Sequence, residues 1–345
     1  MDHANDNQVT PSKIMQIGMG FWASKTLLTA VNLGLFTLLS EGALSGREIQ
    51  GRLGLHQRSL FDFLDTLVAL GFLERTGLKE NALYRNSPDS NLFLDSNKPS
   101  YIGGLLEMAN NRLYGFWNDL EESLKTGKPQ NETKNGGESL FEAIYASQER
   151  LREFIHAMGG AQAGNFMALA SKFDFSKYNT LCDIGGSGAN LSILVAKNHD
   201  HIKCTSFDLP PVGPIALENI TSFGLDDRIS VVSGDFFEDD LPEADIITMG
   251  NILHDWGYED KLMLTKKAYD ALPDGGAFIV IENIIDDERN KNAFGLMMSL
   301  NMAIETDHGY DFSASDFKQW SEEAGFKETE VLPLAGPSSA IIAYK

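Results

Sequence analysis

The residues most able to do chemistry stand where a run of apolar residues meets a cluster of glycines. Residues 181–188 read Leu-Cys-Asp-Ile-Gly-Gly-Ser-Gly, and a helical pattern follows from Ala189. This order is typical of a strand, a tight turn and the start of a helix, an arrangement that places a ligand at a helix N-terminus. Glycine lets the backbone approach a ligand closely because it has no Cβ atom. We therefore predict a ligand site at this turn.

An acidic residue follows at the end of the next apolar run. Asp208 comes directly after residues 202–207, and a carboxylate at this spacing can accept both hydroxyls of a ribose. The dinucleotide pattern G-x-G-x-x-G is not met, because Leu191 stands where the third glycine would be. These observations favour a nucleoside without a pyrophosphate, and S-adenosylmethionine (SAM) fits that description.

The elements that must position these residues form an α/β pattern. Several apolar runs alternate with helical segments, which predicts parallel strands joined by crossover helices in a doubly wound sheet. A hairpin is expected at the end of the chain, over 326–332 and 340–344. The runs expected to be parallel strands are 180–184, 202–207, 229–233, 244–250 and 277–282.

Polar residues follow the later strands too, at the edge where an open α/β sheet binds its ligands. Asp235 and Phe236 follow the third strand, His254 and Asp255 the fourth, and Glu282 ends the fifth. Agreement among separate strand ends supports a single site more strongly than any one motif. For Asp255 we favour a structural interpretation, as the N-cap of a helix before Trp256.

His254 is the candidate general base. A phenol with a pKa near 10 is mostly protonated at neutral pH, and a histidine within hydrogen-bond reach can remove its proton. Glu282 could orient the imidazole through its other nitrogen. A competing hypothesis is a metal site, in which His254 and Asp255 are joined by Glu305 or His308.

The N-terminal part predicts a different kind of domain. Residues 12–40 are expected to form one or two helices that are apolar on more than one face, which is typical of a core or subunit contact. Residues 45–86 predict a winged helix, in which Ser45 caps a first helix, Gly54 ends it, and a second helix runs over 58–70. That second helix has little basic surface, so we favour packing over DNA binding. Helices are also expected over 101–124 and 138–172, joined by a polar loop.

Composition limits the classes of partner. The 345 residues have a net charge of −21, and residues 179–345 hold 29 Asp and Glu against 11 Lys and Arg. Such a surface repels a phosphate backbone, so no nucleic-acid partner is expected. The N-terminus lacks the apolar core of a secretory signal, and no apolar run suffices to span a bilayer. With Cys182 and Cys204 in apolar runs, we expect buried free thiols in a cytoplasmic protein.

The motifs together resemble a known family. Six stretches stand in its order and at its spacings, and the resemblance covers nearly the whole chain. The family is that of the SAM-dependent O-methyltransferases of the caffeate, acetylserotonin and bacterial polyketide type, which join a winged-helix dimerisation domain to a class I methyltransferase domain. The stretches are Asp183-Ile-Gly-Gly-Ser-Gly188, Phe207-Asp-Leu-Pro210, Gly234-Asp-Phe-Phe237, Leu253-His-Asp-Trp256, Leu272-Pro-Asp-Gly-Gly276 and Ile281-Glu282.

The resemblance implies a homodimer with a seven-stranded sheet, SAM as methyl donor and S-adenosylhomocysteine (SAH) as product. It implies three parts: a dimerisation domain over 1–100, a helical connector over 101–178 and the SAM-binding domain over 179–345. Asp311 matches a family glutamate beside the base, in a shorter loop. Gly250 departs from the pattern, because many relatives carry Lys or Arg there. The implied cofactor residues are Asp183, Gly185, Gly186, Gly188, Asp208, Leu209, Asp235 and Phe236.

The acceptor is expected to bind between the two domains. Methionine and aromatic walls suit a flat aromatic molecule, so the expected reaction is O-methylation of a small aromatic metabolite. One alternative is metal-assisted C-methylation of a keto acid, or another non-O-methylating reaction of the same fold. A second is a SAM-sensing winged-helix regulator. The candidate substrate residues are Met108, Trp117, Phe154, Met158, Asp255, Met298 and Met302.

Overall fold

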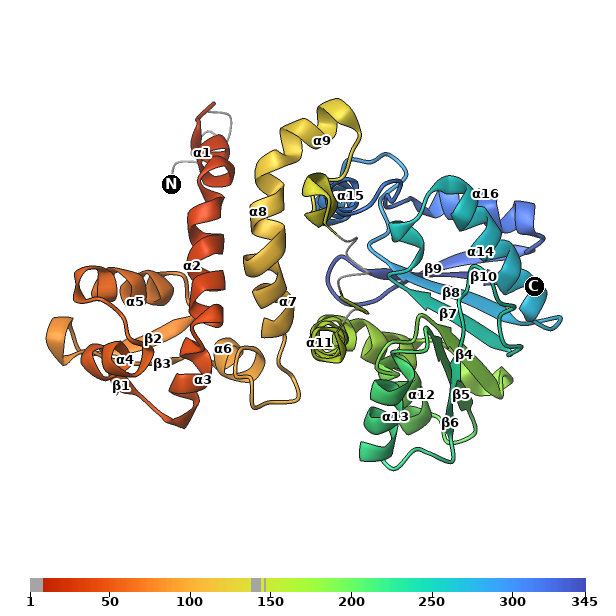
Figure 1. The fold of residues 1–345 in the computed structure, drawn as a ribbon, viewed down its shortest axis with the longest axis horizontal. Coiled ribbons are helices and arrows are strands. Elements are labelled where there is room, and N and C mark those ends of the chain that lie inside the picture. Colours follow the sequence, from red (N-terminus) through yellow and green to blue (C-terminus); the bar gives the residue numbers. More distant parts are fainter. Residues whose placement is uncertain (1–8, 138–143, 146) are drawn as a thin grey trace, which may run out of the picture. The chain divides into compact units, whose positions relative to one another are not determined.

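The chain divides into two compact units, Met1–Tyr114 and Gly115–Lys345. The fold is taken from a computed structural model, which describes residues 9–137, 144–145 and 147–345 (Figure 1). The first unit includes the start of segment 101–178, which the sequence analysis assigned to a connector.

The first unit is mostly helical and contains one small sheet. Its sheet has three strands in the order β1-β3-β2, and both strand pairs are antiparallel. The elements are α1 (Ser12–Gly18), α2 (Gly20–Asn32), α3 (Leu35–Leu38), β1 (Leu44–Ser45), α4 (Gly46–Leu53), α5 (Leu60–Ala69), β2 (Leu73–Thr76), β3 (Leu83–Asn86), α6 (Pro88–Phe93) and α7 (Gly103–Met108).

Local sequence signals explain where α4 begins and ends. The Ser45 side chain accepts a hydrogen bond from the Glu48 amide, and the Glu48 carboxylate accepts one from the Ser45 amide, which makes a reciprocal capping box. Gly54 ends the helix with φ +66°, a left-handed conformation that glycine adopts without strain. The two helices expected over 45–86 are therefore present, with the second helix starting at Leu60 after a 3₁₀ turn, and β2 and β3 pair as a hairpin after them.

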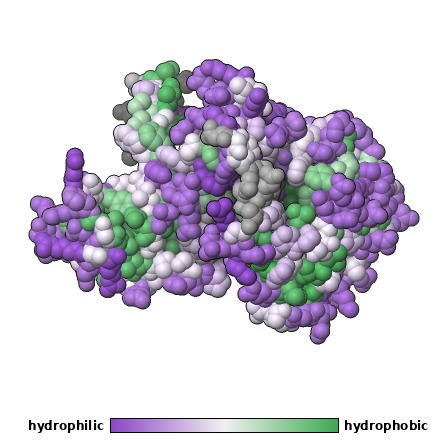
Figure 2. Space-filling view, viewed as in Figure 1, coloured by the Kyte–Doolittle hydropathy of each residue, from purple (hydrophilic) through white to green (hydrophobic). Residues whose placement is uncertain are grey.

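The N-terminal helices carry large exposed apolar side chains. None of the residues of α1 is buried, and the exposed fractions are 75% for Ile14, 75% for Ile17 and 62% for Trp22. Figure 2 shows hydrophobic surface over this end of the first unit. Within the described residues, no helix alone is long and apolar enough to cross a bilayer. Ser12–Asn32 and Leu35–Glu41 meet the test only as a pair bent by 55°.

The second unit is built on a seven-stranded sheet. The strand order is β6-β5-β4-β7-β8-β10-β9, with β10 antiparallel to both neighbours and the other pairs parallel. This confirms the predicted doubly wound sheet and terminal hairpin, with boundaries shifted by at most two residues. The strands are β4 (Thr180–Ile184), β5 (Lys203–Asp208), β6 (Ile229–Ser233), β7 (Ile246–Gly250), β8 (Ala277–Glu282), β9 (Glu328–Pro333) and β10 (Ser339–Tyr344).

Alternate residues of the central strands point to two separate cores. In β8, Ile279 and Ile281 join the core that includes α11 and α12, while Phe278 and Val280 join the core that includes α14 and α16. Because both faces are covered, all six residues of β8 are buried. Figure 1 shows α12 and α14 over opposite faces of the sheet. The helices are α11 (Gln148–Lys172), α12 (Asn190–Asn198), α13 (Gly213–Ser222), α14 (Tyr258–Ala271), α15 (Ala293–Glu305) and α16 (Ala314–Ala324).

The segment expected as one helix over 101–124 is interrupted. After α7 the backbone makes a π-helical turn over Ala109–Leu113, then α8 (Tyr114–Phe116), a 3₁₀ turn over Trp117–Asp119, and α9 (Leu120–Thr126). Gly127 ends α9 with φ +66°. Of the helix expected over 138–172, residues 138–143 and 146 lie outside the described residues.

Candidate active site

The glycine turn after β4 is shaped so that side chains are excluded from it. The amides of Gly185 and Gly186 both donate hydrogen bonds to the Phe207 carbonyl on β5. A Cβ atom on Gly186 would lie 2.3 Å from the Ser206 hydroxyl and 3.0 Å from the Asp183 carbonyl. Gly185 has φ +66°, and its missing Cβ would lie 2.4 Å from Ile252. The turn is thus a backbone-walled cradle ahead of α12.

Two acids lie behind this turn, of which Asp183 is buried and Asp208 is half-buried. The Asp208 carboxylate accepts hydrogen bonds from the amides of Ser187 (2.8 Å) and Leu209 (2.7 Å). Burial raises the pKa of Asp208, which the two amide bonds oppose. Asp183 accepts a 2.6 Å hydrogen bond from the Thr248 hydroxyl, and burial raises its pKa to about 7. Asp208 therefore fixes the turn and presents its charge at the ends of β4 and β5.

The loop after β6 adds an aromatic wall beside Asp208. The Gly234 amide donates to the Asp208 carbonyl at 3.0 Å, so the ends of β5 and β6 adjoin. The Asp235 carboxylate accepts from the amide of Phe237 at 2.9 Å. The Phe236 ring lies 6.1 Å from the Trp256 ring in an edge-to-face contact. The predicted cofactor residues of the three strand ends, Gly188 and Leu209 included, thus stand along one edge of the sheet.

The structure adds two residues that sequence reasoning missed. Tyr145 belongs to this edge, because the negative charge of Asp208 adds to burial in raising the pKa of its phenol. Lys267 on α14 donates to the carbonyls of Phe236 (2.7 Å) and Asp239 (2.6 Å) and holds the loop after β6. No motif marks either residue, since tyrosines and helix-surface lysines are common.

His254 sits inside a ring of carboxylates. Its Nδ1 atom is 3.3 Å from Glu282 Oε2 and 3.5 Å from Asp311 Oδ1, while Nε2 is 3.6 Å from Asp255 Oδ1. Glu282 also accepts from the His254 amide at 3.3 Å. All of these side chains except Asp255 are at least nine-tenths buried. The fold therefore brings His254 together with its predicted partner Glu282 and with Asp311, the residue that matches the family glutamate.

Electrostatics in this ring favour a proton on the imidazole. Burial alone lowers the pKa of His254, but the three carboxylates outweigh it and raise that pKa to about 10. Burial also raises the pKa of Glu282 to about 7, against the opposing effect of His254. The pKa of Asp255 is raised for the same reason. The imidazole of this buried group therefore holds a proton at neutral pH.

The structural interpretation of Asp255 is wrong. Asp255 ends a 3₁₀ turn over Leu253–Asp255, and α14 begins two residues after Trp256 with Gly257 as its N-cap. Asp255 instead faces the imidazole of His254.

The competing metal hypothesis named a different set of residues from the one the fold assembles. Among the described residues, the group able to offer donor atoms within 4.8 Å of one another is His254, Glu282 and Asp311. Asp255, Glu305 and His308 are not part of it. Glu305 is buried at the end of α15, and His308 is exposed in the loop that follows.

The predicted substrate residues fall into separate neighbourhoods. Trp117 Nε1 donates to Asn301 Oδ1 of α15 at 2.9 Å, so Trp117 lies beside the helix that carries Met298 and Met302. Phe154 packs against a small cluster around Ile155, and Met158 lies one turn further along α11. Met108 belongs to the first unit, at the end of α7.

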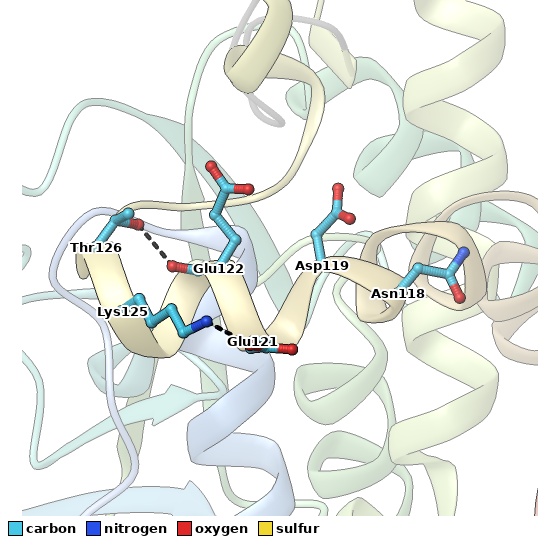
Figure 3. A pocket seen from close by; sticks show the side chains of 6 residues that line it. All are labelled: Asn118, Asp119, Glu121, Glu122, Lys125 and Thr126. Carbon is cyan, nitrogen blue, oxygen red and sulfur yellow. Dashed lines mark hydrogen bonds and ion pairs between the residues drawn. The ribbon is translucent and has the colours of Figure 1, made fainter.

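The surface hollow in this region is polar and holds none of the predicted substrate residues. It is lined by side chains of the turn before α9 and of α9 itself, and they point outward (Figure 3). The Thr126 hydroxyl donates to the Glu122 carbonyl, and Lys125 pairs with Glu121. The lining residues are Asn118, Asp119, Glu121, Glu122, Lys125 and Thr126.

The fold and the cradle define the class of protein: a class I SAM-dependent methyltransferase. Comparison with known families gives the family. Residues 117–327 match the O-methyltransferase domain, and residues 15–96 match the O-methyltransferase dimerisation domain. The chain therefore belongs to the family of SAM-dependent O-methyltransferases that carry a dimerisation domain.

Relatives and solved structures agree with this assignment. The chain is 38% identical to the tetracenomycin polyketide synthesis 8-O-methyl transferase TcmO of Streptomyces glaucescens, over 97% of each chain. It is 32% identical to the N,N-dimethyltransferase OxyT of Streptomyces rimosus, over 91% of this chain and 90% of that one. The structure of human N-acetylserotonin methyltransferase in complex with SAM superposes with a TM-score of 0.90 at 28% identity, covering 100% and 99% of the two chains.

Proposed function

We propose that this enzyme transfers the methyl group of SAM to a hydroxyl of a small aromatic metabolite, with His254 as general base. The observation that carries the proposal is the buried imidazole among three carboxylates, on the strand edge that also holds the glycine cradle. Ile252, whose side chain fills the space beside Gly185, stands two residues before His254 and links the two features. Relatives named as acting on polyketides and acetylserotonin support an aromatic acceptor.

The residues of the cradle fit SAM. A Cβ atom would fill the turn at Gly186, and Asp208 offers a half-buried carboxylate where ribose hydroxyls are expected. Bound SAM supplies an electrophilic methyl group on a sulfonium. Asp208 would bind the ribose, and Asp235 and Phe236 the adenine. The adenine roles are those that the family resemblance implies, and the positions of the residues along one edge agree with them.

The raised pKa of His254 agrees with a base in this reaction. As the acceptor oxygen bonds to the methyl carbon and the carbon–sulfur bond breaks, the hydroxyl proton passes to the imidazole. Because the carboxylates stabilise imidazolium, they favour that transfer. The same ion pair forms if the acceptor enters as phenolate beside an imidazolium that already carries its proton. Glu282 and Asp311 both approach Nδ1, so they hold the ring with Nε2 on the opposite side.

The decisive experiment is an acceptor screen that follows label from SAM, run with and without a chelator. Transfer to a phenol that survives chelation supports the proposal. A requirement for a divalent metal would favour the group of His254, Glu282 and Asp311 as a metal site. Transfer to amines alone would favour N-methylation, the activity named for OxyT.

We also propose that the first unit is a winged helix that makes a homodimer rather than a DNA contact. The dimerisation-domain match and the exposed apolar residues of α1 and α2 support the dimer. In the small sheet and its neighbour α5, Arg75 pairs with Asp65 at 2.6 Å and Arg85 pairs with Glu74 at 2.5 Å, which neutralises basic surface. Specific, salt-sensitive binding in a mobility-shift assay would favour the regulator instead.

A cytoplasmic location stays part of the proposal. Cys182 and Cys204 are free and buried, as expected for thiols in a reducing compartment. Cell fractionation of tagged protein, with the tag at the C-terminus, tests it.

A further inference from the structure

A lysine lies buried behind the catalytic histidine. Lys261, in the first turn of α14, has an exposed fraction of 0%. Its Nζ atom donates to the Trp256 carbonyl at 2.5 Å and stands 3.5 Å from the centre of the Tyr310 ring. Burial of an ammonium without charge partners is strongly unfavourable, so its surroundings must offset that cost.

These two contacts join the backbone segments that carry two of the carboxylates. Trp256 directly follows Asp255, and Tyr310 directly precedes Asp311. The segments are already packed closely, because a Cβ atom on Gly309 would lie 2.6 Å from the His254 carbonyl and 2.7 Å from that of Asp255. The ammonium therefore bridges the two sides of the pocket around the imidazole.

The charge of Lys261 opposes that of the acids around His254. Glu282, Asp311, Asp255 and the neighbouring Asp260 all favour its protonated form, whereas burial, the largest effect, lowers its pKa to about 8. Within the described residues near His254, no ion pair joins Lys261 directly to a carboxylate, so it acts through space. As a general scale, two unit charges ~7 Å apart at an effective dielectric constant of ~20 change each other's pKa by about one to two pH units.

We propose that Lys261 is a positioning residue of the active site. Its ammonium holds the Asp255 and Asp311 segments together and keeps the carboxylates around His254 ionised. This inference rests on the proposed role of His254 as the base.

The proposal predicts the direction of a pH effect. Without the positive charge, Glu282 and Asp255 bind protons at higher pH, and His254 keeps its proton to higher pH. The deprotonated form of His254 is therefore reached only at a higher pH. The acidic limb of the kcat/KM profile should move to higher pH by about one unit.

The test compares three variants by their pH profiles. Lys261→Met keeps the length of the side chain without the charge, and it should shift the acidic limb upward while SAH affinity by calorimetry stays within about twofold. Lys261→Arg keeps the charge and should return the limb toward that of the wild type. Lys266→Met is the matched control, since Lys266 is an exposed lysine of the same helix, paired with Asp270. It should leave the profile unchanged.

Two results would overturn the proposal. One is a folded Lys261→Met enzyme with the wild-type pH profile. The other is a Lys261 amine that is neutral below pH 7, because such an amine supplies no charge. NMR titration of the lysine ε-carbons of the wild-type enzyme measures this, with the Lys261 signal assigned by its loss in Lys261→Arg. This measurement does not require the methionine variant to fold. If the wild type methylates no acceptor, the proposed function fails separately, and the His254 imidazole titration in Lys261→Met still decides the role of Lys261.

Discussion

At the scale of single residues, the site depends on where a proton sits. His254→Ala removes the proposed base without touching the glycine cradle, so turnover should fall about 10²–10⁴-fold while SAH affinity stays near that of the wild type. Initial rates with labelled SAM and calorimetric titration with SAH measure the two quantities. If the alanine enzyme is fully active, His254 is not the base.

The chain provides a matched control for that substitution. His308 is exposed, three residues before Asp311 in the sequence, and lies outside the group around His254. His308→Ala should keep both turnover and SAH affinity. An equal loss in both alanine variants would mean that the effect comes from general damage to the protein.

Asp208 tests the cofactor side of the same edge. Asp208→Ala removes the proposed ribose contact and two hydrogen bonds that hold the turn, so SAH affinity should fall at least about tenfold, equivalent to ~1.4 kcal/mol. Asp200→Ala is the control, because Asp200 is exposed in the turn that precedes β5, at the opposite end of that strand from Asp208. Calorimetric titration of both folded variants with SAH measures the two affinities. An unchanged affinity in Asp208→Ala would show that Asp208 does not bind the ribose.

Residue types and strand ends were enough to predict the main members of the site. His254 and Glu282 meet because the ends of β7 and β8 share one edge of a parallel sheet, while Asp311, which only the family resemblance implied, reaches them from the loop after α15. The role of Asp255 was predicted wrongly, since the start of a helix can move by two residues without any change in the capping signal. Lys261 was not predicted at all, because burial of a lysine depends on tertiary packing.

At the scale of elements, one close approach sets the geometry of the base. The loop after α15 passes so near the turn before α14 that Gly309 has no room for a Cβ atom. Gly309→Ala must push two backbone carbonyls apart, so it should cost about 1–3 kcal/mol of unfolding free energy. It should also lower turnover, because the displaced loop carries Asp311. Denaturant unfolding and initial rates give the two values.

Gly51→Ala is the control for Gly309→Ala, because it replaces a glycine at a position where a Cβ atom meets no close neighbour. Gly51 lies in α4 with no heavy atom within 4 Å of its Cβ direction. Alanine favours a helix over glycine by about 0.8–1.0 kcal/mol, so this variant should be slightly more stable. A Gly309→Ala protein as stable and active as the wild type would show that the loop moves freely.

Periodicity predicted the sheet better than it predicted the helices. Strands such as β8 are buried on both faces, so their apolar runs are continuous and have definite ends. The segment over 101–124 has a helical pattern throughout, yet its backbone changes type at Ala109–Leu113 and again at Trp117–Asp119. Those changes depend on what the segment packs against, which a hydrophobic pattern does not encode.

At the scale of the whole molecule, the apolar N-terminal helices need a partner. Side chains such as Ile17 and Trp22 are more than half exposed, and such a patch on a soluble protein marks an interaction surface. Because residues 15–96 match a dimerisation domain, the expected partner is a second copy of the chain. Light scattering at low micromolar concentration should give twice 38.0 kDa.

Charge placed on this surface should separate the copies. An unpaired carboxylate inside an apolar interface costs several kcal/mol, so Ile17→Asp with Trp22→Asp should weaken the dimer at least about 10²-fold. Leu124→Asp is the control, because Leu124 is 66% exposed on α9, outside the matched dimerisation domain, and should leave the mass unchanged. A wild-type protein that scatters as a 38.0 kDa species would contradict the homodimer, and the apolar helices would then need a different partner.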